Sequence, residues 1–141
     1  MRIDVCSQAA ALRLASDAAE KTALLSITSK GEPDVGFADN TNIVSILHLK
    51  FNDLSEECDE EGIPYGRPLP VQEDFAGLKA FADGLSCEHV IVHCWEGRSR
   101  SAAVAIALQE YLGREGSLSF LEGEVTPNPL VLELARRALG K

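Results

Sequence analysis

Residues 89–112 constrain the fold more than any other part of the chain. They read HVIVHCWEGRSRSAAVAIALQEYL: a short β-branched apolar run, then a loop of small and polar residues, then a helical pattern that is apolar almost all round. Such a run is typical of a central strand in a parallel sheet, and a helix without a polar face has to be buried. The segment predicts a strand His89–His93 that turns through a loop into a buried helix Ser99–Leu112.

Strand-like and helix-like patterns alternate along the rest of the chain. We expect strands at Arg2–Cys6, Thr22–Thr28 and Asn42–Phe51, and helices from Gln8 to about Glu20, from Val71 to Leu85 and from about Leu130 to Leu139. This alternation predicts an α/β fold in which helices flank a central, mostly parallel sheet of about four to five strands. The 141 residues contain no Pro/Gly/Ser-rich linker, so we expect a single domain over residues 1–141.

Composition and charge exclude several classes of function. The net charge is -9 at pH 7, which argues against partners that need a basic surface, namely nucleic acid and anionic membranes. No stretch approaches the ~20 apolar residues of a membrane span, and no basic-then-apolar leader precedes the first strand. Four cysteines without paired spacing predict neither disulfides nor a metal site. We therefore expect a cytoplasmic protein that uses no metal or cofactor.

The loop after the predicted strand His89–His93 has the chemistry of an oxyanion site. Cys94 and Arg100 stand on either side of Gly97, and the loop opens directly into a helix. Inward-pointing N–H groups and the positive end of that helix attract an anion, and a guanidinium can hold two of its oxygens. The same positive field favours the thiolate form of Cys94, which predicts a nucleophile where a bound phosphorus would lie.

The pattern H-C-x-x-G-x-x-R-[ST], here His93, Cys94, Gly97, Arg100 and Ser101, resembles the signature of the cysteine-based protein tyrosine phosphatase superfamily. The surrounding text resembles its small dual-specificity type, strongly over residues 71–112 and more weakly elsewhere. The resemblance implies a dual-specificity-phosphatase-like fold and hydrolysis of phosphomonoesters through a cysteinyl-phosphate on Cys94. It implies that Arg100 and the loop amides bind the phosphate, that Ser101 assists departure of the sulfur, and that His93 braces the loop.

The resemblance also implies a general acid from a loop after an earlier strand. Asp53 follows the apolar run Asn42–Phe51 and is the expected acid. Forty residues separate Asp53 from Cys94, which is long for the small type, and we assign the surplus to an acidic excursion over residues 54–70. That excursion supplies rival acids in Glu56, Glu57 and Asp59. A mobile lid and an inert surface insertion are both compatible with its composition.

The other loop residues bear on the substrate, and we expect Trp95, Glu96, Gly97, Arg98, Ser99 and Arg100 to contact it. Trp95 can form a wall for an aromatic ring or pack beneath the loop, and Arg98 can contact phosphate or point outward. Glu96 disfavours polyanions such as inositol polyphosphates or triphosphate-capped RNA. A phosphorylated protein or a small phosphomonoester is the expected partner. The sequence leaves the oligomeric state open.

Other functions and one regulatory role stay open at this point. A catalytically silent phosphate-binding module would keep Arg100 and the loop but lack a working acid. Sulfur transfer and arsenate reduction also use a cysteine in an anion-binding loop, although without this motif and helix. Cys6 ends the predicted first strand, where it could form a reversible disulfide with Cys94.

Overall fold

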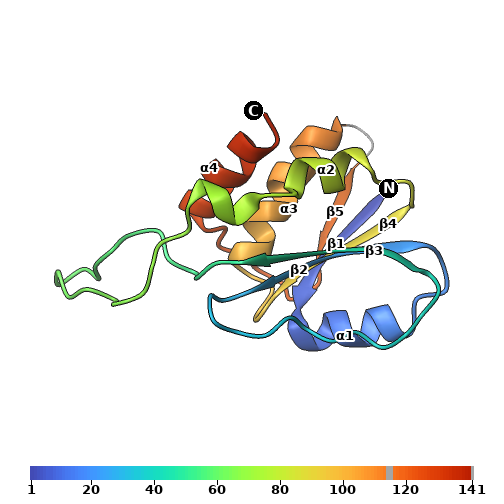
Figure 1. Ribbon diagram of the computed structural model, residues 1–141, viewed down its shortest axis with the longest axis horizontal. Coiled ribbons are helices and arrows are strands. Elements are labelled where there is room, and N and C mark those ends of the chain that lie inside the picture. The colour runs from blue at the N-terminus through green and yellow to red at the C-terminus, as the bar shows by residue number, and fades with distance from the viewer. Residues whose placement is uncertain (114–115, 141) are drawn as a thin grey trace.

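Five parallel strands form one sheet in the order β3-β2-β4-β1-β5 (Figure 1). The computed structural model describes residues 1–113 and 116–140. The strands are β1 (Arg2–Ser7), β2 (Thr22–Thr28), β3 (Ile43–Lys50), β4 (His89–Cys94) and β5 (Ser117–Phe120). Because all five run in one direction, their carboxyl ends lie along the same edge of the sheet. The predicted α/β class with a parallel sheet flanked by helices is confirmed.

Helices cover both faces of the sheet, which explains why every residue of β2 and β4 is buried. Helix α1 (Gln8–Ser16) lies on one face, and α2 (Leu78–Asp83), α3 (Arg100–Leu112) and α4 (Pro129–Ala138) lie on the other (Figure 1). None of the helices in the described ranges is long and apolar enough to cross a membrane.

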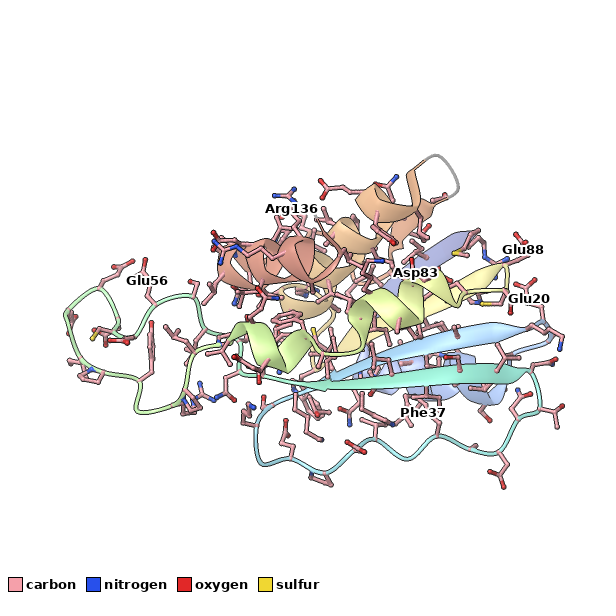
Figure 2. The ribbon with its side chains drawn as sticks, turned by 45° about the horizontal axis from the view of Figure 1, so that its top comes forward. Glu20, Phe37, Glu56, Asp83, Glu88 and Arg136 are labelled. Carbon is pink, nitrogen blue, oxygen red and sulfur yellow. The ribbon has the colours of Figure 1, made fainter. Side chains whose placement is uncertain are left out.

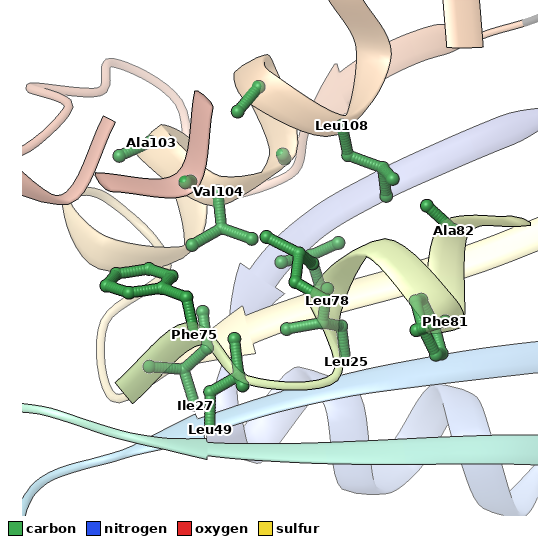
Figure 3. Close-up of a cluster of buried hydrophobic side chains, with 14 of the residues drawn as sticks. Leu25, Ile27, Leu49, Phe75, Leu78, Phe81, Ala82, Ala103, Val104 and Leu108 are labelled. Carbon is green, nitrogen blue, oxygen red and sulfur yellow. The ribbon is translucent and has the colours of Figure 1, made fainter. Parts of the chain in front are cut away.

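The larger part of the core lies between the sheet and α2, α3 and α4. Figure 3 shows Leu25 and Leu49 of the sheet facing Leu78, and Val104 and Leu108 of α3 above them. A smaller cluster lies under α1 and contains Cys6, Leu24 and Ile91 of the sheet with the small residues Ala10, Ala11 and Ala15. Side chains alternate along a strand, so neighbouring residues pack against helices on opposite faces of the sheet.

Two predicted helices differ from the observed ones. The single helix expected over residues 71–85 is wrong: a 3-10 turn, η1 (Gln72–Phe75), is separated from α2 by Gly77, whose φ of 91° lies in the left-handed region. Helix α1 ends at Ser16 rather than near Glu20. The Asn40 side chain donates from Nδ2 to the carbonyl oxygens of Ala15, Ser16 and Ala18, and so satisfies the carbonyl groups at this end of the helix. The short edge strand β5 was not predicted at all.

The acidic excursion (residues 54–70) extends away from the body of the molecule at the carboxyl edge of the sheet (Figures 1 and 2). Its outer part is held by its own backbone: Asp59 N donates to Ile63 O at 3.0 Å, and Tyr65 N donates to Glu57 O at 3.1 Å. The Asp59 carboxylate closes the tip by accepting from the N–H groups of Glu61 and Ile63. The outer part of the excursion, residues 57–65, is therefore a hairpin-like arm closed by its own hydrogen bonds, and the root of the excursion follows Asp53.

Candidate active site

The loop from Cys94 to Arg100 curls back on itself between the end of β4 and the start of α3. Its tightest point is Gly97, with a φ of 77°. A Cβ at Gly97 would lie 2.6 Å from both the carbonyl oxygen of Cys6 and the amide nitrogen of Ser7. The backbone of β1 therefore leaves room only for glycine, and β1 acts as the seat of the loop.

Cys94 lies at the bottom of a hollow with a volume of about 190 Å³, lined by Asp53, Cys94, Trp95, Glu96, Arg98, Ser99 and Arg100. A water molecule takes up ~30 Å³ in the liquid, so the hollow has room for a phosphate group. The Cys94 side chain is only 3% exposed. Its sulfur accepts a hydrogen bond from Gly97 N at 3.3 Å and lies 3.1 Å from Ser101 Oγ. A thiolate at this position would accept hydrogen bonds from both groups.

Arg100 borders the same hollow and is almost fully buried, with 7% exposure. Its Nη1 donates to Ser29 Oγ and to the carbonyl oxygen of Phe51, both at 3.0 Å. Its Nε is buried and has no hydrogen-bond partner among the described residues. Since an unsatisfied buried donor on a charged group is costly, the geometry is one that an anion would complete.

The loop backbone offers further donors. The N–H groups of Glu96, Arg98 and Ser99 donate to no other described residue, whereas Gly97 N is committed to the sulfur. These groups belong to the turn that lines the hollow and leads into α3. An oxyanion above Cys94 would therefore meet free amides and the positive end of a 13-residue helix.

Asp53 lines the hollow, and the rival acids Glu56, Glu57 and Asp59 are not among the lining residues. One oxygen of Asp53, Oδ1, accepts hydrogen bonds from Ser99 Oγ at 2.7 Å and from Asn128 Nδ2 at 2.9 Å. The other oxygen, Oδ2, has no partner among the described residues. Asp53 is thus oriented by two donors on one side and free on the other.

His93 lies behind the loop, in the layer between the sheet and α1, and is fully buried. Its Nδ1 is 3.2 Å from the carbonyl oxygen of Cys94, and its Nε2 is 2.6 Å from Ser26 Oγ. Burial lowers the pKa of His93 below its usual value of 6.5, so the ring is neutral near pH 7. A neutral ring that donates from Nδ1 accepts from Ser26 at Nε2, an arrangement that fixes the Cys94 carbonyl.

Cys6 is unfavourably placed for a disulfide with Cys94. Its Cα pairs with His93, so its side chain joins the cluster under α1, whereas Cys94 belongs to the cluster under α3. The two side chains therefore point to opposite faces of the sheet. Burial is the main cause that raises the pKa of the Cys6 thiol to about 12, which leaves almost no thiolate at neutral pH.

The rim of the hollow is formed by Trp95, Glu96 and Arg98. Trp95 is 66% exposed, so it borders the hollow and does not pack beneath the loop. Glu96 is also exposed and brings negative charge to the rim. Arg98 lines the hollow, but its Nη1 donates to the carbonyl oxygen of Glu124, which turns at least that nitrogen towards the segment after β5.

Sequence reasoning missed three residues that hold the site together. Ser29 orients Arg100, Ser26 pairs with His93, and Asn128 contacts Asp53. Asn128 before Pro129 was recognisable as a helix start, but nothing in the local sequence indicated its link to a residue 75 positions earlier.

A second, larger hollow of about 420 Å³ lies at the amino end of the sheet and is lined by residues that include Arg2, Glu20 and His89. Two of its polar side chains are paired: His89 Nε2 is 2.7 Å from Asp4, and Arg2 is 2.6 Å from Glu20. No cysteine is among the residues that line this hollow, whereas Cys94 and Arg100 line the other one, so the hollow around Cys94 is the candidate active site.

No protein-family model matches the chain, and no curated protein matches its sequence significantly. Among solved structures, the crystal structure of PTPMT1 in complex with PI(5)P is similar, with a TM-score of 0.52 and 17% sequence identity. The match covers 97% of this chain and 89% of that chain. The likeness shows that the chain has the fold of a dual-specificity-type phosphatase.

Proposed function

We propose that this protein hydrolyses phosphate monoesters through a covalent intermediate on Cys94. The observation that carries the proposal is that Cys94 and Arg100 line the same hollow, and that the buried Nε of Arg100 has no hydrogen-bond partner among the described residues. A guanidinium with an unused donor beside a nucleophile is suited to bind a tetrahedral oxyanion. The phosphatase fold supports the same conclusion.

In the first step, the Cys94 thiolate attacks phosphorus and the bond from phosphorus to the ester oxygen breaks. Asp53 gives its proton to the leaving oxygen, and Arg100 with the free loop amides stabilises the oxygens of the transferred group. In the second step, water attacks phosphorus, Asp53 takes a proton from that water, and the sulfur leaves. Ser101 Oγ, 3.1 Å from the sulfur, stabilises the departing thiolate.

We propose a monoester on a protein side chain or a small molecule as the substrate. The solved neighbour is a complex with PI(5)P, but here Glu96 lies at the rim and the loop contains no lysine. The exposed Trp95 offers a flat wall on which an aryl phosphate can stack. An aryl monoester therefore fits the rim better than a polyanion.

The test is hydrolysis of para-nitrophenyl phosphate by the purified protein without added metal. We expect turnover, inhibition by vanadate, and loss of turnover in Cys94→Ser. Arg100→Lys keeps the charge but not the planar fork, and should lower kcat/KM by at least about 100-fold. Full activity in Cys94→Ser would refute the proposed mechanism.

A further inference from the structure

The side chain of Asn128 joins three parts of the molecule. Its Oδ1 accepts from the N–H groups of Leu130 and Val131 and so caps α4. Its Nδ2 donates to Asp53 Oδ1 at 2.9 Å and to the carbonyl oxygen of Leu54 at 3.1 Å. Its backbone N donates to the carbonyl oxygen of Ser99 at 3.3 Å. Asn128 is only 5% exposed, so water competes little for these bonds.

We propose that Asn128 is a positioning residue for the general acid: it holds Asp53 over the Cys94 hollow with the proton-bearing oxygen turned to the substrate. This inference rests on the proposed function. Oδ1 of Asp53 is occupied by two donors, Ser99 Oγ and Asn128 Nδ2. A proton on the carboxyl group is therefore carried by Oδ2, the oxygen without a partner among the described residues.

Asp53 needs such a restraint because of where it stands in the chain. It is exposed, and it lies at the root of the acidic excursion, whose outer hydrogen bonds are internal to the arm. A misplacement of ~1 Å in a catalytic group can cost ~100-fold in rate. Asn128 fixes both the carboxylate of Asp53 and the next peptide group, at Leu54, relative to the phosphate-binding loop.

The identity of the residue at position 128 separates this role from helix capping. Asn, Asp and Ser are about equally good N-caps, so capping alone would accept any of them. Of the three, only Asn has an amide that can donate to the Asp53 carboxylate while its oxygen caps the helix. Asn128→Asp therefore keeps the cap and places a repelling acceptor where the donor was.

The experiment compares kcat/KM for two substrates that differ in their need for an acid. Phenyl phosphate has a poor leaving group and depends on proton donation, whereas para-nitrophenyl phosphate depends on it much less. For Asn128→Asp we expect a loss of about 10- to 100-fold on phenyl phosphate and of less than about threefold on para-nitrophenyl phosphate. Asp53→Asn sets the limit for complete loss of the acid. Asn128→Asp should also lower the melting temperature, because its carboxylate faces that of Asp53, but the ratio of the two substrates is measured on the same folded enzyme and is independent of that loss.

Two further variants control for stability. Asn128→Ser keeps a capping oxygen but lacks the amide, and should show the same substrate-selective loss if Asn128→Asp does not fold. Pro129→Ala weakens the first turn of α4 without touching the Asp53 contact, and should leave the ratio of the two substrates unchanged. An unchanged ratio in both Asn128 variants, or an equal loss on both substrates, would overturn the role of Asn128. Wild-type protein that hydrolyses neither substrate would instead refute the proposed function itself.

Discussion

The contact between Gly97 and β1 leads to a prediction that can be worked out in energetic terms. Gly97→Ala forces an L-residue to a φ of 77°, which costs about 1–2 kcal/mol. It also drives a methyl group to 2.6 Å from Cys6 O and Ser7 N, which are backbone atoms of a buried strand and cannot move aside cheaply. Overpacking of this kind costs about 1–3 kcal/mol. We expect a total loss of about 2–5 kcal/mol, a large share of the ~5–15 kcal/mol typical of a domain.

Gly123→Ala separates the two contributions. Gly123 has a φ of 88°, but a Cβ there would meet nothing within 4 Å. This variant carries the backbone strain without the collision, so its loss should stay near about 1–2 kcal/mol. Urea unfolding of both variants measures the difference directly. Gly97→Ala should also lose hydrolysis of para-nitrophenyl phosphate under conditions in which it remains folded, because the loop from Cys94 to Arg100 has to move away from the backbone of β1.

If Gly97→Ala is no less stable than Gly123→Ala and keeps its activity, the loop from Cys94 to Arg100 does not pack on β1. The same reasoning would then fail for the orientation of Cys94, since Gly97 N is a hydrogen-bond donor to its sulfur.

Two further predictions concern pH and the acidic excursion. Because burial lowers the pKa of His93, its contribution to stability is complete above pH 6.5, the usual pKa, and is lost as pH falls through the lower folded pKa. Urea unfolding from pH 8 to pH 5 should show a decline in the unfolding free energy, and His93→Gln should reduce that decline. Replacing residues 57–65 by a short glycine-serine turn should change the unfolding free energy by less than about 1 kcal/mol and preserve para-nitrophenyl phosphate hydrolysis, because the hydrogen bonds at the tip are internal; a large loss of either would show that the arm supports the fold or the site.

The features predicted correctly from sequence depend on neighbours in the chain. The apolar runs of β2 and β4 and the apolar pattern of α3 indicate burial directly, and the two strands and most of α3 are buried in the structure. Cys94 and Arg100 lie within a few residues of each other in the sequence, and the structure brings them to the same hollow. The break at Gly77 was missed because the apolar spacing on either side of it continues in helical phase. The strand β5 has only four residues, whose side chains alternate between exposed and half-buried, so its sequence shows no apolar run. It is defined by its pairing with β1.

The contacts that orient the site could not be predicted from the chain because they join residues that are distant in sequence. Asn128 meets Asp53 across 75 positions, and Arg100 meets Ser29 across 71. Ser29 and Asn128 are polar loop residues, and nothing in their local patterns indicates these distant partners. Only the strand order determines which loops come together, and that order follows from the packing of the whole sheet.

All five strand ends contribute to the candidate site, and this explains why one short motif is not sufficient to build it. Cys94 ends β4, and the loop behind it rests on the end of β1. Ser29, just after β2, and the carbonyl of Phe51, just after β3, hold the Arg100 guanidinium. The segment after β5 closes the ring, since Thr126 N donates to the carbonyl oxygen of Arg98 at 2.9 Å. The carboxyl ends of parallel strands lie along one edge of the sheet. The motif therefore provides Cys94 and Arg100, and the loops at this edge of the sheet fix the orientation of their side chains.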